Sequence, residues 1–196
     1  MSVVLIPGER DGRGVRLSVK ALTGQNRLTL DFTLAPEDVL WGGGEQMSHL
    51  ALNGRTFPIW TSEPGVGREP GTPLTDMASA DGSFAGGDYW TTNYPEPTVL
   101  CSGGWAISLA NAEYAELDAS AQGRLRVHIW SGDVAIDLFE GAPADLTRQL
   151  AARFGPRHAL PEWALGGAVV GLKQGEASFE RLDALIEAGA AVSSLW

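Results

Sequence analysis

The sequence predicts a mainly β fold, an antiparallel β-sandwich followed by a single βαβ unit. Three observations carry this prediction. Apolar residues recur at every second position from residue 15 to about residue 140. The 25 glycines and 11 prolines among 196 residues predict many turns. After residue 142 the apolar spacing changes to that of helices and buried strands.

Alternation defines the predicted strands of the sandwich. Residues 15–21 and 28–34 alternate on either side of a short polar segment, so we expect them to form a hairpin. The pattern returns at 105–109, 125–129 and 134–138. Between these runs, residues 60–97 are rich in proline and are expected to form long loops, which in compact domains are usually functional. The glycine run at 42–44 is also expected to be a loop.

The last third of the chain has a different organisation. Pro143 suits the first position of a helix and Gly155 suits its end. Residues 164–172 and 190–196 resemble buried parallel strands, with a helix at 175–188 between them. The predicted segments are therefore a sandwich at 1–142, a helix and linker at 143–161, and a βαβ unit at 162–196.

A βαβ unit of about 35 residues cannot bury a core alone. We therefore expect the chain to be the front end of a longer protein whose next domain is parallel α/β. Expressed alone, it should expose apolar faces and aggregate or need a partner.

Composition excludes several functions. Lys and Arg number 14 against 24 Asp and Glu, and the net charge of −10 repels nucleic-acid phosphates and anionic membranes. No run approaches the ~20 apolar residues of a membrane span, and no signal peptide is recognisable, so we expect a cytoplasmic protein. Cys101 is expected to be a buried apolar residue. His49, His128 and His158 have no ligand spacing, so neither a metal nor a cofactor is predicted.

Two neighbourhoods combine side chains suited to sugars. Trp41–Gln46 carries a carboxylate and an amide beside three glycines, and Trp60–Arg68 combines an indole, a carboxylate and a guanidinium. Carboxylates and amides bond to hydroxyl groups, and indoles cover the apolar faces of sugar rings. The alternative is that tryptophans belong to the core, which we expect of Trp105, in phase with Ile107, and of Trp130, at the end of a strand.

The same segments resemble glycoside hydrolase family 31, and within it the sulfoquinovosidase branch. The resemblance rests on Trp-Gly-Gly-Gly-Glu-Gln at 41–46, on Asn-Gly-Arg-Thr-Phe-Pro-Ile-Trp-Thr-Ser-Glu-Pro-Gly-Val-Gly-Arg at 53–68, on Asn-Tyr-Pro-Glu-Pro-Thr at 93–98 and on Leu-Pro-Glu-Trp at 160–163. It covers about residue 38 to residue 196. It implies a galactose-mutarotase-like sandwich followed by a (β/α)8 barrel, of which 164–196 would be the first βαβ unit. Since a barrel needs roughly 250 residues, we expect it to be truncated here.

The family resemblance also implies the chemistry. The reaction would be retaining hydrolysis of an α-glycoside by two carboxylic acids. Both lie on later barrel strands in this family, so we expect no catalytic residue in this chain and no activity from it alone. Its partners would be a small α-glycoside and the remainder of the barrel, with the oligomeric state open.

Six residues are candidates for sugar contact. Glu45 and Gln46 match the family's loop over the barrel mouth, and Trp60 and Arg68 lie in the most specific string. Lys173 and Gln174 follow barrel strand one, where the resemblance would place Gln before Gly-Gly. Lysine occupies that position here, so which of the two faces the pocket stays open. The alternatives are that Glu45 braces its loop or pairs with Arg68, and that Trp60 and Arg68 only pack.

The sequence leaves one alternative open for the substrate and one for the class of function. A sulfonated sugar needs local positive charge, for which Arg68 and Lys173 are candidates in this chain, because the net charge has the wrong sign. A neutral α-glucoside is the rival substrate. A non-catalytic sandwich module that binds carbohydrate or a partner chain is the rival function.

Overall fold

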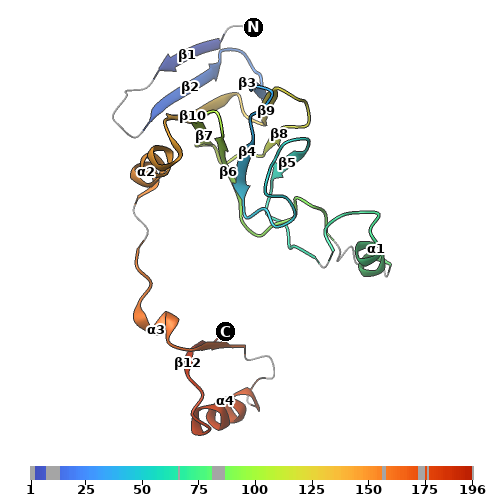
Figure 1. Ribbon diagram of the computed structural model, residues 1–196, viewed down its shortest axis with the longest axis vertical. Helices are drawn as coiled ribbons and strands as arrows, with labels where there is room; N and C mark the ends of the chain where they lie inside the picture. The colour runs from blue at the N-terminus through green and yellow to red at the C-terminus, as the bar shows by residue number, and fades with distance from the viewer. Residues whose placement is uncertain are drawn as a thin grey trace. The chain divides into compact units, whose positions relative to one another are not determined.

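The computed structural model describes residues 3–7, 14–65, 67–80, 87–155, 158–171, 175 and 177–195. The chain divides into two compact units, Met1–Gly155 and Pro156–Trp196, which are described separately (Figure 1). Among the described residues, no helix is long and apolar enough to cross a membrane.

The first unit is built mainly from antiparallel strands. Its described elements are β1 (Val3–Pro7), β2 (Val15–Ala21), β3 (Leu28–Thr33), β4 (Leu40–Gly44), β5 (Thr56–Ile59), α1 (Pro73–Ser79), β6 (Pro95–Cys101), β7 (Trp105–Leu109), β8 (Ala115–Asp118), β9 (Arg124–Ile129), β10 (Asp133–Glu140) and α2 (Pro143–Phe154). One sheet has the order β1-β2-β10-β7-β6-β4 and the other β3-β9-β8-β5. The predicted β-rich fold is confirmed at this level.

The core lies between the two sheets. Leu40, Val99 and Ile136 of the larger sheet belong to the same buried cluster as Phe57 and Ile129 of the smaller one. Burial of each such side chain contributes about 1.5–3 kcal/mol. Cys101 is buried in this cluster as predicted, and burial raises the pKa of its thiol.

The predicted hairpin of residues 15–21 and 28–34 is wrong. β2 pairs with β1 and β10, whereas β3 pairs with β9 in the other sheet. Alternation shows which side chains of a strand point inward, but the inward faces of both sheets of a sandwich have the same pattern. The chain therefore crosses between sheets where the sequence suggested a turn.

Two expectations for loops also need correction. Gly42, Gly43 and Gly44 end strand β4, and Gly42 and Gly44 pair with β6, so the run is not a free loop. The proline-rich stretch 60–97 contains helix α1 and the start of β6. Pro73 occupies the start of that helix, where its missing N–H costs nothing.

Helix α2 confirms the prediction made from Pro143 and Gly155. Pro143 is its first residue, and Gly155 ends it with φ 95°. Leu146 is buried against Phe139 and Ala106.

A carboxylate that is almost fully buried ties α2 to the sandwich. Both oxygens of Asp137 accept hydrogen bonds from Arg16 on β2 at 2.8 Å, and Arg153 on α2 donates to the same group at 2.7 Å. Such charge-assisted, two-pronged contacts are stronger than neutral hydrogen bonds. Asp137 thus joins two strands and a helix.

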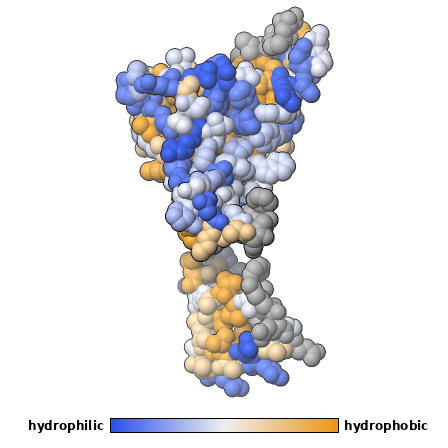
Figure 2. Space-filling model, turned by 90° about the vertical axis from the view of Figure 1, so that its right-hand side faces the viewer, coloured by the Kyte–Doolittle hydropathy of each residue, from blue (hydrophilic) through white to orange (hydrophobic). Residues whose placement is uncertain are grey.

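The second unit has parallel β structure. It contains α3 (Glu162–Leu165), β11 (Ala168–Val170), α4 (Ala177–Glu187) and β12 (Val192–Leu195), with β11 and β12 paired in parallel. The strand expected at 164–172 is shorter than predicted because α3, which begins after Pro161, takes its first residues. The strand is also not covered on both faces, since Ala168 and Val169 are exposed. Apolar side chains accordingly gather on the surface of this unit (Figure 2).

Candidate functional site

The glycine run at 42–44 shapes the end of β4. All three glycines have positive φ (123°, 76° and 88°), which disfavours other residues. A β-carbon on Gly42 would overlap the carbonyl oxygen of Thr98, and one on Gly44 that of Tyr94. The register with β6 shifts between Gly42 and Gly44. The glycines therefore allow close backbone approach and a bulge in the ladder between β4 and β6.

Glu45 and Gln46 follow this bulge and have different environments. The backbone N–H of Glu45 donates to the carbonyl of Tyr94 at 2.9 Å. Its carboxylate is exposed and has no hydrogen-bond or ion-pair partner among the described residues. The Gln46 amide instead donates to the Gly43 carbonyl at 2.8 Å and braces the turn. Glu45 is thus held by its backbone, while its carboxylate is exposed.

The segment 91–94 brings the two candidate neighbourhoods together. Its Tyr94 carbonyl accepts from Glu45, its Thr92 carbonyl accepts from the N–H of Ser62 at 2.9 Å, and its Thr91 carbonyl accepts from Arg68 at 3.0 Å. Thr91 and Thr92 are themselves buried. Both sequence motifs therefore attach to one strip, of which only Asn93 and Tyr94 belong to a motif that the family resemblance singled out.

Arg68 and Trp60 take separate places. Arg68 is half-buried and donates a hydrogen bond to the Thr91 carbonyl, and among the described residues no ion pair joins it to Glu45. Trp60 contacts the ring of Tyr114 edge-on at 6.0 Å and is still 58% exposed. Arg68 is therefore held by the strip 91–94, and Trp60 presents most of its indole to solvent.

A histidine that sequence reasoning set aside lies beside Arg68. Nε2 of His49 is 2.9 Å from a carboxylate oxygen of Glu69, without the alignment of a hydrogen bond, and the ring contacts Tyr89 edge-on. His49 and Glu69 line a cavity of about 410 Å³ together with Arg68 and neighbouring residues. His49 and Glu69 are twenty positions apart, so spacing could not reveal the contact.

The remaining candidates are not placed. Lys173 and Gln174 lie outside the described residues. In the described part of the chain, no group of three or more His, Cys, Asp or Glu side chains could hold a metal ion.

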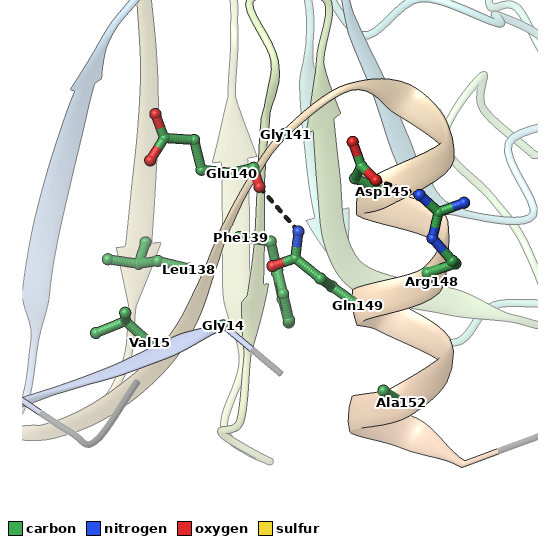
Figure 3. A pocket seen from close by; sticks show the side chains of 10 residues that line it. All are labelled: Gly14, Val15, Leu138, Phe139, Glu140, Gly141, Asp145, Arg148, Gln149 and Ala152. Carbon is green, nitrogen blue, oxygen red and sulfur yellow. Dashed lines mark hydrogen bonds and ion pairs between the residues drawn. The ribbon is translucent and has the colours of Figure 1, made fainter. Parts of the chain in front are cut away.

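A cavity of about 850 Å³, which sequence reasoning did not anticipate, lies between β2, β10 and α2 (Figure 3). The Gln149 amide donates across it to the carbonyl of Glu140 at 2.8 Å, and Arg148 pairs with Asp145. It is lined by Gly14, Val15, Leu138, Phe139, Glu140, Gly141, Asp145, Arg148, Gln149 and Ala152. Since several of its polar groups pair with one another, we assign it no ligand.

Comparison with solved structures defines the class of protein. The fold is shared by glycoside hydrolase family 31 structures that are below 25% identical, among them a Flavobacterium johnsoniae dextranase (TM-score 0.63, 13% identity, 89% of this chain and 22% of that one). A family 31 sulfoquinovosidase from E. rectale, solved with an aza-sugar inhibitor, matches with TM-score 0.77 and 31% identity over 93% of this chain and 28% of that one. No protein-family model matches the sequence.

Curated relatives give the narrower assignment. A sulfoquinovosidase of Agrobacterium fabrum is 42% identical over 187 residues, which cover 95% of this chain and 28% of that protein. A sulfoquinovosidase of Escherichia coli is 36% identical over 174 residues, 87% of this chain and 25% of that protein. The chain is thus sulfoquinovosidase-like, with the sequence and the fold of part of a glycoside hydrolase family 31 protein.

Proposed function

We propose that this chain is the N-terminal part of a retaining α-glycosidase that hydrolyses α-sulfoquinovosides. The observation that carries the proposal is its 42% and 36% identity to two sulfoquinovosidases over nearly its whole length. In the proposed protein the sandwich would be of the galactose-mutarotase type, and the second unit would begin the catalytic barrel. Two carboxylic acids about 5–5.5 Å apart would perform the reaction, and both would come from outside these 196 residues.

The chain's own contribution would be to the rim of the sugar pocket. Glu45 is the leading candidate because its backbone is held by Tyr94 while its carboxylate is exposed and without a partner among the described residues. An ionised carboxylate accepts hydrogen bonds from sugar hydroxyls. Gln46 would hold the turn, and Arg68 would place positive charge near the rim. Lys173 and Gln174 would follow the first barrel strand.

The proposal is tested on the native protein. An antibody raised against this chain would be used to isolate the protein from its own cells for intact-mass measurement and for assays on 4-nitrophenyl α-sulfoquinovoside and 4-nitrophenyl α-glucoside. We expect a mass above 20.8 kDa by at least a barrel of roughly 250 residues, and faster hydrolysis of the sulfonated substrate. A native mass of 20.8 kDa would reject catalysis and favour a binding module. Faster hydrolysis of the glucoside would reject the sulfonated substrate.

The role of Glu45 has its own test in that active protein. Glu45→Gln should raise KM about three- to tenfold with a smaller change in kcat, since it weakens hydrogen bonds to bound sugar. Glu37→Gln, another exposed carboxylate of the first unit, is the matched control and should leave both constants unchanged. Equal behaviour of the two variants would remove Glu45 from the pocket.

A further inference from the structure

A row of three aromatic rings and one guanidinium crosses one end of the smaller sheet. Ile59, Ala115, Ile129 and Leu28 are paired residues on strands β5, β8, β9 and β3. The next positions along the same ladder are Trp60, Tyr114, Trp130 and Arg27. We call these four residues the aromatic row.

Contacts confirm that the row is continuous. The Arg27 guanidinium lies 5.0 Å over the Trp130 ring, Trp130 contacts Tyr114 edge-on at 4.8 Å, and Tyr114 contacts Trp60 at 6.0 Å. The backbone N–H of Trp130 also donates to the backbone carbonyl of Tyr114 at 3.0 Å. Adjacent strands lie about 4.8 Å apart, so four strands give a row of roughly 14 Å, longer than a single sugar ring.

The aromatic row lies on the outward face of the sheet. Leu28, Ala115 and Ile129 are buried in the core, and successive side chains of a strand point to opposite faces. Arg27 and Trp60 are exposed, and Tyr114 and Trp130 are half-buried. Cross-strand packing explains the two central rings, but it does not explain a terminal tryptophan that leaves 58% of its surface in solvent.

Polar groups that can bond to hydroxyls accompany the row. Glu116, two residues after Tyr114 on β8 and therefore on the same face, accepts a hydrogen bond from the Tyr114 hydroxyl at 2.8 Å. At the Trp60 end, a cavity of about 370 Å³ is lined by Trp60, Tyr114, Asn111, Glu113 and two prolines of β6. The Asn111 amide donates to Glu113 at 2.9 Å and to the Asp133 carbonyl at 2.9 Å, which fixes the carboxylate at the cavity.

From this arrangement we propose that the aromatic row and the cavity beside it bind an uncharged saccharide of more than one ring. Ring faces would lie on the Trp60 indole and its neighbours, and hydroxyls would donate to Glu113 and Glu116. The net charge of −10 and the carboxylates beside the rings disfavour anionic sugars and nucleic acids, which stack on similar rings only in basic grooves. The site does not depend on hydrolysis by a larger protein.

Fluorine NMR on the native protein that contains this chain, labelled with 5-fluorotryptophan, tests the proposal, with resonances assigned from single Trp→Phe variants. Maltotriose and cellotriose are the uncharged probes, and digalacturonic acid is the anionic one. We expect the resonances of Trp60 and Trp130 to shift and saturate with an uncharged probe. Trp163, a comparably exposed tryptophan of the second unit (62%), should not shift, and digalacturonic acid should bind at least about tenfold more weakly.

Variants separate binding from sheet stability. Trp60→Ala should weaken saccharide binding at least about tenfold, and Tyr114→Phe about two- to fivefold, while Trp163→Ala changes nothing. If Trp60→Ala does not fold, as judged by its thermal melt, the wild-type titration decides alone. Absence of saturable shifts, unchanged affinity in Trp60→Ala, or equal binding of digalacturonic acid would overturn the proposal. Shifts of Trp60 with protein concentration alone would overturn it too and assign the face to self-association.

Discussion

The two units of this chain bury their apolar residues to very different extents. In the first, large side chains such as Phe57 and Ile136 are fully inaccessible between two sheets. In the second, Leu165, Phe179 and Ile186 are more than half exposed. The sequence of the second unit is no poorer in apolar residues than that of the first, so a shortage of apolar residues does not produce the difference. An apolar face contributes to stability only where another layer covers it. The first unit provides both layers, because its two sheets cover each other.

The largest expected effect is on the core of the first unit. Phe57→Ala should destabilise the sandwich by about 3–5 kcal/mol, through lost burial and a residual cavity. Phe179→Ala, at a side chain that is 56% exposed in the second unit, should cost less than about 1 kcal/mol. Hydrogen exchange of the amides of each unit would measure both. Similar costs would mean that Phe179 is covered in solution and would remove the contrast between the units.

Two glycines with positive φ give the next comparison. Gly42→Ala should cost about 3 kcal/mol, because its β-carbon would meet the Thr98 carbonyl in addition to adopting an unfavourable φ. Gly189→Ala, at φ 82° in open space after α4, should cost only about 1 kcal/mol. Urea unfolding of both variants measures the difference. Equal costs would show that the approach of β4 to β6 relaxes easily.

Asp137 tests how α2 is attached to the sandwich. Asp137→Asn should lower stability by about 2–3 kcal/mol, because a neutral amide cannot serve both Arg16 and Arg153. Exchange of the α2 amides should accelerate more than that of β8, which belongs to the other sheet. Uniform acceleration throughout the unit would contradict a local role.

The smallest effect concerns acid. Burial alone would raise the pKa of Asp118, but hydrogen bonds from Ser120 and Thr56 and the nearby Arg124 outweigh it and lower the pKa below its usual 3.8. Stability from this group is therefore full above about pH 4 and is lost as the pH falls through the lowered pKa. Asp118→Asn should lower the free energy of unfolding by about 1 kcal/mol at neutral pH. It should also reduce the further loss of stability on acidification. Urea unfolding midpoints at successive pH values would check this. If the midpoint falls with pH equally in the wild type and the variant, Asp118 does not cause the loss of stability in acid.

What the sequence could predict follows from local rules. Alternation located the strands at 15–21, 125–129 and 134–138, and Pro143 with Gly155 delimited α2, since these signals act within a few residues. The partners of β2 and β3 were mispredicted because no local signal specifies which sheet a strand joins. The role of the glycines at 42–44 was missed because it depends on the backbone of β6.

The same limit on prediction from local sequence applies to the candidate site. Glu45, Trp60 and Arg68 could be selected by residue type and by resemblance, and the structure gives each a place. The attachment of Glu45, Ser62 and Arg68 to the strip 91–94 could not be predicted, because backbone carbonyls accept hydrogen bonds whatever the side chain. The aromatic row was also invisible in sequence, since its members are brought into line only by the register of four strands.

The order of strands has a consequence for biosynthesis. Arg16 and Asp137 meet across 121 positions, and β2 lies between β1 and β10 in its sheet. At 5–20 residues per second, the ribosome needs roughly 6–24 s after making β2 to deliver its inner neighbour. Through that interval, the edge of β2 that will later face β10 has no strand to pair with. Slowing of translation between residues 21 and 133 would therefore prolong the exposure of a strand edge suited to unwanted pairing.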